Sequence, residues 1–122
     1  MSTGRMRRVD EAIRQVLGDA VAGELKDPRV GFVTVTDVRT SSDLRHARVY
    51  VSVLGDAGRP STSEQRQDTM AGLRSAHGFL QSKVASELHL KRTPTIELFY
   101  DDTTDRALRV DELIEEIGGG RG

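Results

Sequence analysis

The sequence predicts a single α+β domain, and three patterns of apolar residues lead to this prediction. Between residues 9 and 25, apolar side chains recur at the three- and four-residue spacing of an amphipathic helix. Between residues 45 and 54 they alternate with polar side chains, as in a half-buried strand. A run rich in β-branched residues at 31–38 and the segment TIELFY at 95–100 supply two further strands. At 122 residues, the chain has the length of one domain.

The connections between these elements predict how the sheet is built. The dipeptide Asp27-Pro28 ends the first helix. The short polar segment 39–43 joins the first two strands, which favours an antiparallel hairpin. A long helical region returns the chain from the second strand to the third along the same sheet. We therefore expect a mixed three-stranded sheet with helices on one face.

Two helices separated by a kink are expected between the second and third strands. Overlapping capping boxes at 61–64 and 62–65 mark the start of the first helix, after a Gly- and Ser-rich loop at 55–63. The second helix has on its apolar side Phe79, Leu80, Val84 and Leu88, and we expect Phe79 to lie in the core. Gly78 interrupts the helical pattern, which favours a break there.

The C-terminal part of the sequence differs from the rest in charge. Residues 1–95 carry 15 Lys and Arg against 11 Asp and Glu, whereas residues 96–122 carry 3 against 8. We expect residues 1–102 to form the folded domain, and residues 103–122 to form an acidic helix followed by a disordered Gly-rich tail. A mildly basic body with an acidic end indicates a polyanion-binding face, although charges solvated all round are the alternative.

The composition excludes several classes of protein. The absence of Cys excludes a disulfide scaffold, a Cys zinc site, an iron–sulfur centre and a thiol nucleophile. No apolar run is long enough to span a bilayer. The basic N-terminus lacks the apolar region of a secretory signal, and we expect a cytoplasmic protein.

No set of residues with the spacing of a catalytic or metal site is present. The three imidazoles, His46, His77 and His89, are not spaced as zinc ligands. There is no GxSxG nucleophile turn and no glycine-rich phosphate cradle. The neighbouring carboxylates at 101–102 and 115–116 are typical of caps and of a solvated helix face. We therefore expect neither an enzyme nor a bound metal or cofactor.

Basic residues instead suggest phosphate binding. Fifteen of the 18 cationic residues are Arg, whose planar guanidinium suits phosphate oxygens. Cations near the start of a helix are disfavoured by the helix dipole, so helix stability gives little reason for the arginines before residue 9. Phosphate contact would explain them. The alternative explanation is that they belong to a frayed tail in solvent. The predicted phosphate contacts are Arg5, Arg7, Arg8, Arg45, Arg48, Arg74, Lys83, Lys91 and Arg92.

The expected kink is a second candidate for RNA contact. Backbone N–H groups opened by a helix break form an anion site, and we expect RNA to approach the segment formed by Ser75, Ala76, His77 and Gly78. Only five aromatic residues are available for base stacking, namely Phe32, Tyr50, Phe79, Phe99 and Tyr100. Recognition of phosphate and shape is therefore favoured over base reading.

Several motifs, in this order, resemble the bacterial ribosome-binding factor A family. They are Arg8-Val9, Asp27-Pro28-Arg29, Gly31-Phe32-Val33-Thr34-Val35-Thr36, Ser42-Asp43-Leu44, Ala47-x-Val49-Tyr50-Val51-Ser52, Ala76-x-Gly78-Phe79-Leu80 and Thr93-Pro94-x-Ile96-x-Leu98-Phe99-Tyr100-Asp101. Each is weak alone, but their order and spacing are specific. The resemblance covers about residues 5–102, and the loop at 55–63 and the acidic C-terminal segment depart from it.

The resemblance implies a type II KH-like fold, in which an Ala-x-Gly helix–kink–helix replaces the GxxG loop. It also implies a non-enzymatic assembly factor that binds the free 30S ribosomal subunit through 16S rRNA. Such a factor assists late 16S rRNA processing and 30S maturation, notably in the cold, and is released by a ribosome-assembly GTPase. We expect a monomer. A generic KH-like RNA-binding module and a protein-interaction domain without an RNA role remain the alternatives.

Overall fold

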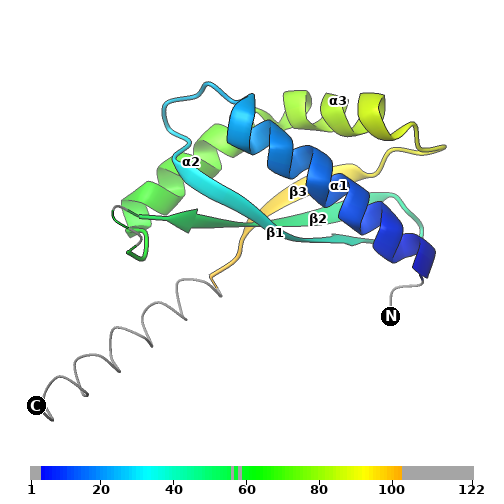
Figure 1. The fold of residues 1–122 in the computed structure, drawn as a ribbon, viewed down its shortest axis with the longest axis horizontal. Helices are drawn as coiled ribbons and strands as arrows, with labels where there is room; N and C mark the ends of the chain where they lie inside the picture. The colour runs from blue at the N-terminus through cyan, green and yellow to red at the C-terminus, as the bar shows by residue number, and fades with distance from the viewer. Residues whose placement is uncertain (1–3, 56, 58, 103–122) are drawn as a thin grey trace, which may run out of the picture.

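The computed structural model describes residues 4–55, 57 and 59–102 (Figure 1). Their order of helices and strands is the predicted one, and the elements are α1 (Gly4–Gly23), β1 (Phe32–Thr40), β2 (His46–Leu54), α2 (Ser63–Ser75), α3 (His77–Leu88) and β3 (Thr95–Tyr100). The acidic helix and Gly-rich tail expected at 103–122 lie outside the described residues.

The three strands form one mixed sheet in the order β1-β2-β3. β1 and β2 are antiparallel, and β2 and β3 are parallel, as the long helical connection between them requires. A bulge shifts the register between Val35 and Asp37, so the alternation of β1 restarts with Val38 buried. At the bulge, the Thr36 hydroxyl donates to Asp101 Oδ2 at 2.8 Å, which joins β1 to the residues that follow β3.

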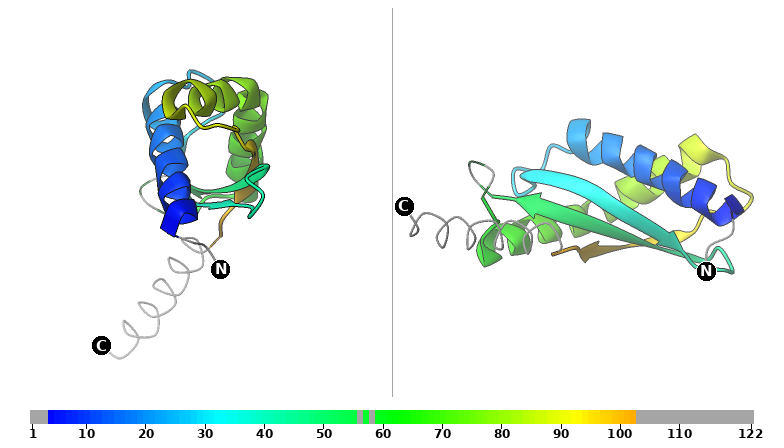
Figure 2. Two further views of the ribbon diagram at one scale, coloured as in Figure 1. Left: turned by 90° about the vertical axis from the view of Figure 1, so that its right-hand side faces the viewer. Right: turned by 60° about the horizontal axis from the view of Figure 1, so that its bottom comes forward.

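All three described helices cover the same face of the sheet (Figure 2). The core lies between the two layers, where the inward side chains of β2 meet those of the helices. The predicted inward face of β2 is confirmed, since Ala47, Val49, Val51 and Val53 are all buried. Helix residues that are fully enclosed there include Ile13, Leu17, Leu73, Leu80 and Val84.

α1 begins five residues earlier than predicted, at Gly4 instead of residue 9, and ends at Gly23. The prediction followed apolar periodicity, which starts only at Val9. Arg and Met are good helix formers, however, and extend the helix toward its N-terminus without apolar contacts. This extension matters for function, because it places Arg5, Arg7 and Arg8 on a helix instead of in a tail.

Of the two overlapping capping boxes predicted, the one at 62–65 begins α2, and the predicted kink follows this helix. The Thr62 hydroxyl accepts from the Gln65 backbone N–H at 3.1 Å, and Gln65 Oε1 accepts from the Thr62 N–H at 2.7 Å. Ala76 ends α2 and begins α3, with φ −89° and ψ 9°. The prediction that Phe79 lies in the core was wrong: this residue is 41% exposed, because the buried face of α3 is formed by Leu80 and Val84 and Phe79 lies to one side of it.

The architecture is the predicted α+β, KH-like arrangement, with a helix–kink–helix between the second and third strands. Within residues 4–55, 57 and 59–102, no helix has the length and apolar character needed to cross a membrane.

Candidate nucleic-acid interface

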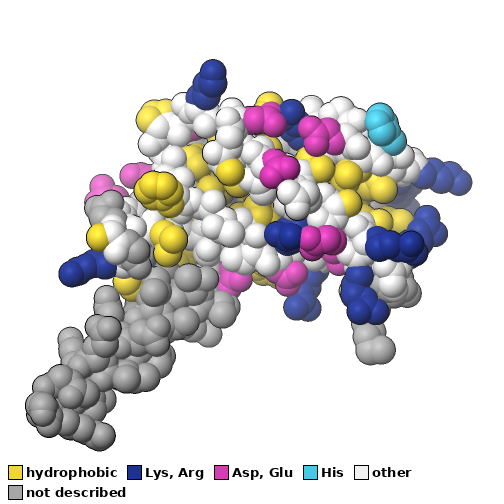
Figure 3. Space-filling view, in the orientation of Figure 1, with side chains coloured by type: hydrophobic (Ala, Val, Ile, Leu, Met, Phe, Trp, Pro, Cys, Tyr) yellow, Lys and Arg dark blue, Asp and Glu magenta, His cyan; other side chains and the backbone are white. Residues whose placement is uncertain are grey.

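Basic side chains gather at one end of the molecule, where α1 begins and the α3–β3 loop lies. Figure 3 shows Lys and Arg side chains concentrated at the right-hand end, whereas Asp and Glu lie over the middle. The first turns of α1 supply Arg5, Arg7 and Arg8. The loop after α3 supplies Lys91 and Arg92. We call these five residues the cationic end.

The cationic end is available to a ligand. All five side chains are exposed, and none has an ion pair with a described residue. Several other cations are instead engaged with carboxylates: Arg14 with Glu11, Arg29 with Asp27, and Arg39 with Asp37. The five cations outnumber the carboxylates near them, Asp10, Glu11 and Asp43, so this end keeps a net positive field that attracts polyanions.

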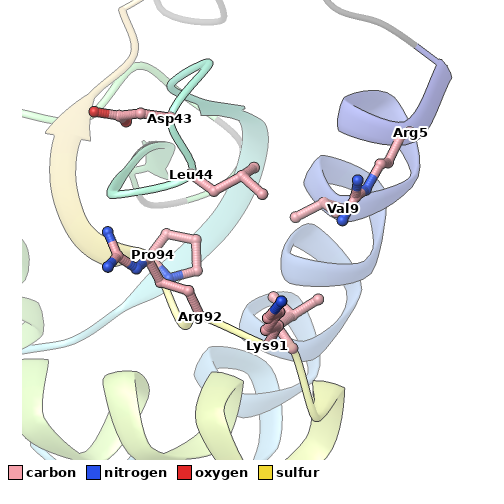
Figure 4. Close-up of a pocket in the computed structure, with 8 residues that line it drawn as sticks. Arg5, Val9, Asp43, Leu44, Lys91, Arg92 and Pro94 are labelled. Atoms are coloured by element: carbon pink, nitrogen blue, oxygen red, sulfur yellow. The ribbon is translucent and has the colours of Figure 1, made fainter.

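A cavity of about 270 Å³ lies within the cationic end (Figure 4). Three elements enclose it: the first turns of α1, the β1–β2 turn and the α3–β3 loop. The lining residues are Arg5, Val9, Asp43, Leu44, Leu90, Lys91, Arg92 and Pro94. In Figure 4, Val9 and Leu44 extend toward each other, whereas the Asp43 carboxylate points away from them. The cavity thus combines aliphatic walls with a cationic rim.

The kink is a second exposed feature, separated from the cationic end by α3. α3 has 12 residues, so its ends lie about 18 Å apart. Arg74, Ser75 and Gly78 are exposed at the kink, and no side chain caps the start of α3. Nothing lies within 4 Å of where a Cβ on Gly78 would be, so the backbone there is open to a close approach.

The imidazole of His77 faces inward. Its Nε2 lies 2.8 Å from the backbone oxygen of Ile96, which ties the start of α3 to β3. Gln81 completes this attachment, since its side chain bonds to Pro94 O at 2.8 Å and to the Ile96 N–H at 2.9 Å. At the kink, then, backbone and Arg74 face solvent, and the His77 ring holds the helix on the sheet.

The turn after α1 packs against the kink. Arg29 Nη2 donates to Ser75 Oγ at 3.1 Å and pairs with Asp27 Oδ2 at 2.6 Å. Hydrogen bonds from the Arg29 side chain and backbone lower the pKa of Asp27 to about 2. Gly72 permits this contact, because a Cβ there would lie 2.7 Å from Val30 Cγ2.

Lys83 is the predicted phosphate contact that is most firmly engaged within the protein. Its Nζ lies 2.7 Å from Glu24 Oε2 and 3.5 Å from Glu87 Oε1, and 5.8 Å from the centre of the Phe79 ring. The hydrogen bond with Glu24 raises the pKa of Lys83. Its charge links α3 to the end of α1 and contributes little net positive field.

The two cations predicted on the second strand differ from each other. Arg48 is exposed on the open face of the sheet and makes no ion pair with a described residue. Arg45 lies at the end of the β1–β2 turn with its Nε 3.8 Å from Asp43 Oδ2, and both side chains are largely exposed. Such an exposed, long contact is weak and leaves Arg45 free to turn toward a ligand.

A family model described as ribosome-binding factor A matches residues 5–114. This match covers most of the chain. The chain belongs to the ribosome-binding factor A family.

Solved structures of similar fold include other proteins of that name. A Thermotoga maritima protein proposed to be a ribosome-binding factor A is 34% identical, covers 81% of this chain and 89% of its own, and has a TM-score of 0.66. The Thermus thermophilus ribosome-binding factor A is 22% identical, covers 78% and 94%, and has a TM-score of 0.63. A homology model of the Thermus protein, fitted into a cryo-electron microscopy map of its complex with the 30S subunit, is 23% identical over 75% of this chain and 90% of its own, with a TM-score of 0.57.

In this ribosome-binding factor A family member, the predicted site residues fall into separate groups. Arg5, Lys91 and Arg92 meet around the cavity. Arg74 and the segment 75–78 form the kink at the other end of α3. Lys83 lies between the two groups and is paired. Whether these residues contact RNA stays a prediction.

Two residues at these features were not singled out from the sequence. Arg29 supports the kink through Ser75, and the motif Asp27-Pro28-Arg29 was its only sequence signal. Leu44 lines the cavity with φ 59°, a left-handed conformation that leucine rarely adopts. A short polar turn with leucine where Asn or Gly is usual was the signal that could have identified it.

Proposed function

We propose that this protein is a non-enzymatic assembly factor that binds the free 30S subunit through 16S rRNA. In this role it assists late 16S rRNA processing and 30S maturation. The observation that carries the proposal is the cationic end, five exposed cations without ion pairs to described residues, on a chain of the ribosome-binding factor A family. The Thermus relative fitted into a map of a 30S complex supports the choice of subunit.

Phosphate binding is the chemistry that fits the cationic end. A cation already paired with a carboxylate must exchange one partner for another, whereas an exposed, unpaired cation gains a partner when phosphate arrives. Four of the five residues are Arg, which can bind two phosphate oxygens at once. Binding releases counterions from the RNA, so affinity depends steeply on salt.

The kink supplies a second surface for the same RNA. Arg74 lies beside it, and Gly78 leaves room for a phosphate to approach the backbone at the start of α3. The two surfaces lie about 18 Å apart along α3, a span that a folded rRNA element can bridge. Contact at two surfaces would make the affinity depend on the shape of the rRNA as well as on its charge.

The remaining parts of the proposal follow the family resemblance. We place the protein in the cytoplasm, where subunits mature, and expect it to act as a monomer. We also propose that a ribosome-assembly GTPase releases the protein from the mature subunit, and that cells require the protein in the cold. The protein would catalyse no reaction itself and would act by holding or checking an rRNA conformation.

Co-sedimentation with purified ribosomal subunits tests this function. The full-length protein is mixed with 30S subunits, 50S subunits or 70S ribosomes and separated on a sucrose gradient at low salt. We expect it to migrate with free 30S subunits only. Competition by unrelated structured RNA at equal strength would indicate a generic RNA-binding module, and protein remaining at the top of every gradient would contradict the proposal.

A further inference from the structure

The cavity at the cationic end has the features of a site for one nucleotide. We infer that it takes a single unpaired nucleotide of the bound RNA, with the base between the aliphatic walls and the phosphate on the rim formed by Arg5, Lys91 and Arg92. This inference rests on the proposed RNA-binding function and specifies which part of the RNA this surface holds.

The size and walls of the cavity fit a flat ring. Its volume of about 270 Å³ lies just below the roughly 300–1,000 Å³ of pockets for drug-sized ligands, so it admits one ring system and excludes a helix or a stem. Val9 from α1 and Leu44 from the β1–β2 turn face the cavity from two sides (Figure 4), Leu90 from the α3–β3 loop adds a third half-buried apolar side chain, and the buried Pro94 lies beneath them. Extruded bases are held between apolar or aromatic side chains in this manner.

Leu44 is held in a strained conformation that directs it to the cavity. Its φ of 59° places a branched side chain in the left-handed region, where Gly, Asn or Asp is the usual residue. Turn hydrogen bonds enforce this conformation: the Leu44 N–H donates to Ser41 O at 2.9 Å, and the Arg45 N–H donates to Asp43 Oδ1 at 3.1 Å. Strain that the surroundings maintain is characteristic of ligand-binding positions.

The rim has the charge that a nucleotide phosphate needs. Arg5 reaches it from α1, and Lys91 and Arg92 reach it from the loop after α3, without ion pairs to described residues. A second left-handed residue, His89 with φ 47°, ends α3 and redirects the chain so that Leu90 and both cations of the loop line the cavity.

Apolar walls and a cationic rim together select an anion that also carries an apolar body. A nucleotide meets both requirements, because its base is flat and largely apolar on its faces and its phosphate is charged. Single-stranded loops and bulges of RNA present such bases unstacked. The aliphatic walls contact the ring faces, which all four bases share, so the site would hold an unpaired base with little preference among them.

Methyl nuclear magnetic resonance of the full-length protein tests this assignment. The methyl signals of Val9, Leu44 and Leu90 are followed while one of three probes is added: adenosine 5′-monophosphate, ribose 5-phosphate or octanoate. We expect the adenosine nucleotide to shift all three sets of methyl signals and to bind at least about fivefold more tightly than ribose 5-phosphate. Octanoate, an anion with an aliphatic tail, should bind more weakly than the nucleotide.

Two variants of Leu44 separate ligand binding from packing. Leu44→Asn removes the apolar wall, so nucleotide affinity should fall about five- to tenfold. Asn adopts positive φ more readily than Leu, so the urea midpoint of unfolding should stay level or rise. Leu44→Met keeps an apolar wall and should keep the affinity within about twofold of wild type.

Each contrary result identifies what is wrong. Equal binding of the nucleotide and ribose 5-phosphate would mean that the rim alone binds and would overturn the base site. Tighter binding of octanoate would reassign the cavity to aliphatic anions. A Leu44→Asn variant with unchanged nucleotide affinity would also overturn the inference. Co-sedimentation with 30S subunits is read separately, so the cavity inference can fail while the proposed function stands.

Discussion

Lys83 and Lys91 lie eight residues apart, yet the structure gives them different surroundings. Lys83 is half-buried on α3, with its Nζ 2.7 Å from Glu24 Oε2 and 3.5 Å from Glu87 Oε1. Lys91 is exposed beside Arg92 in the loop after α3, and neither has an ion pair with a described residue. Both lysines were equally good candidates for phosphate contact from their positions in the sequence.

The difference shows that pairing, more than position along the chain, separates structural cations from those available to a ligand. An engaged lysine holds two helices together, and its field is offset by the carboxylates beside it. An unpaired cation keeps its field and contributes to attraction over several ångströms of solvent. We therefore assign RNA binding to the cationic end and helix packing to Lys83.

The largest expected effect comes from reversing charge at the cationic end. Lys91→Glu combined with Arg92→Glu should weaken 30S binding by about 100-fold, because two phosphate contacts are lost and repulsion is added. Lys26→Glu combined with Arg59→Glu is the matched control, since both are exposed and lack ion pairs with described residues but lie away from the cavity. Binding is measured by filter retention of labelled 30S subunits. Equal losses in the two double variants would mean that only net charge matters.

Two glycines of the helix–kink–helix formed by α2 and α3 should respond in opposite ways to alanine. Gly72→Ala places a Cβ 2.7 Å from Val30 Cγ2, so it should lower the free energy of unfolding by about 1–3 kcal/mol. Gly78→Ala meets nothing within 4 Å and should raise that free energy by up to about 1 kcal/mol.

The Gly72→Ala and Gly78→Ala variants also test whether the kink contributes to 30S binding. If RNA approaches the backbone at Gly78, its alanine variant should bind 30S subunits several-fold more weakly although it is more stable. Urea unfolding and 30S binding are measured on the same preparations. A Gly78→Ala variant with wild-type affinity would remove the kink from the interface and leave the cationic end as the binding surface.

Lys83→Gln should change stability and leave binding almost unchanged. Glu24 loses its partner, and since both groups are partly exposed to screening solvent the free energy of unfolding should fall only slightly. Affinity for 30S subunits should stay within about twofold of wild type, because a paired lysine contributes little to phosphate binding. Calorimetry and 30S binding give the two readouts. A larger loss of affinity than of stability would contradict the assignment.

The smallest expected effect concerns the turn that supports the kink. Folding lowers the pKa of Asp27 from 3.8 to about 2, chiefly through its hydrogen bonds with Arg29. The stabilisation is therefore complete above pH 3.8 and is lost as pH falls toward 2. Asp27→Asn should lower the urea midpoint at neutral pH, and its difference from wild type should shrink over this range. A pH-independent difference would assign the effect to packing.

Much of the fold could be predicted because its signals are local. The alternation in β2, the capping box of Thr62 and Gln65, and the glycine near the kink each determine structure within a few residues. The start of α1 was missed, since Arg5 to Arg8 have helix propensity but no apolar pattern. The exposure of Phe79 was missed because an apolar residue beside Leu80 fits the helical pattern, whereas packing on the sheet buries only Leu80 and Val84 fully.

The candidate site was predictable only in its chemistry. Arg5 and Lys91 were identified as cations free to bind phosphate, but their meeting around one cavity depends on how α1 crosses the sheet. The pairing of Lys83 with Glu24 joins residues distant in sequence and has no local signal. In the sequence Leu44 is an ordinary turn residue, and only its left-handed backbone conformation identifies it as a candidate ligand-binding residue.

The salt dependence of 30S binding tests the central claim most directly. The slope of log affinity against log salt counts the phosphates that cations neutralise, at about 0.7–0.9 per contact. We expect Lys91→Gln combined with Arg92→Gln to reduce this slope by about 1.4–1.8, and Lys83→Gln to leave it unchanged. Equal slopes for wild type and both variants, or a reduced slope for Lys83→Gln alone, would contradict the claim that unpaired cations form the RNA-binding surface.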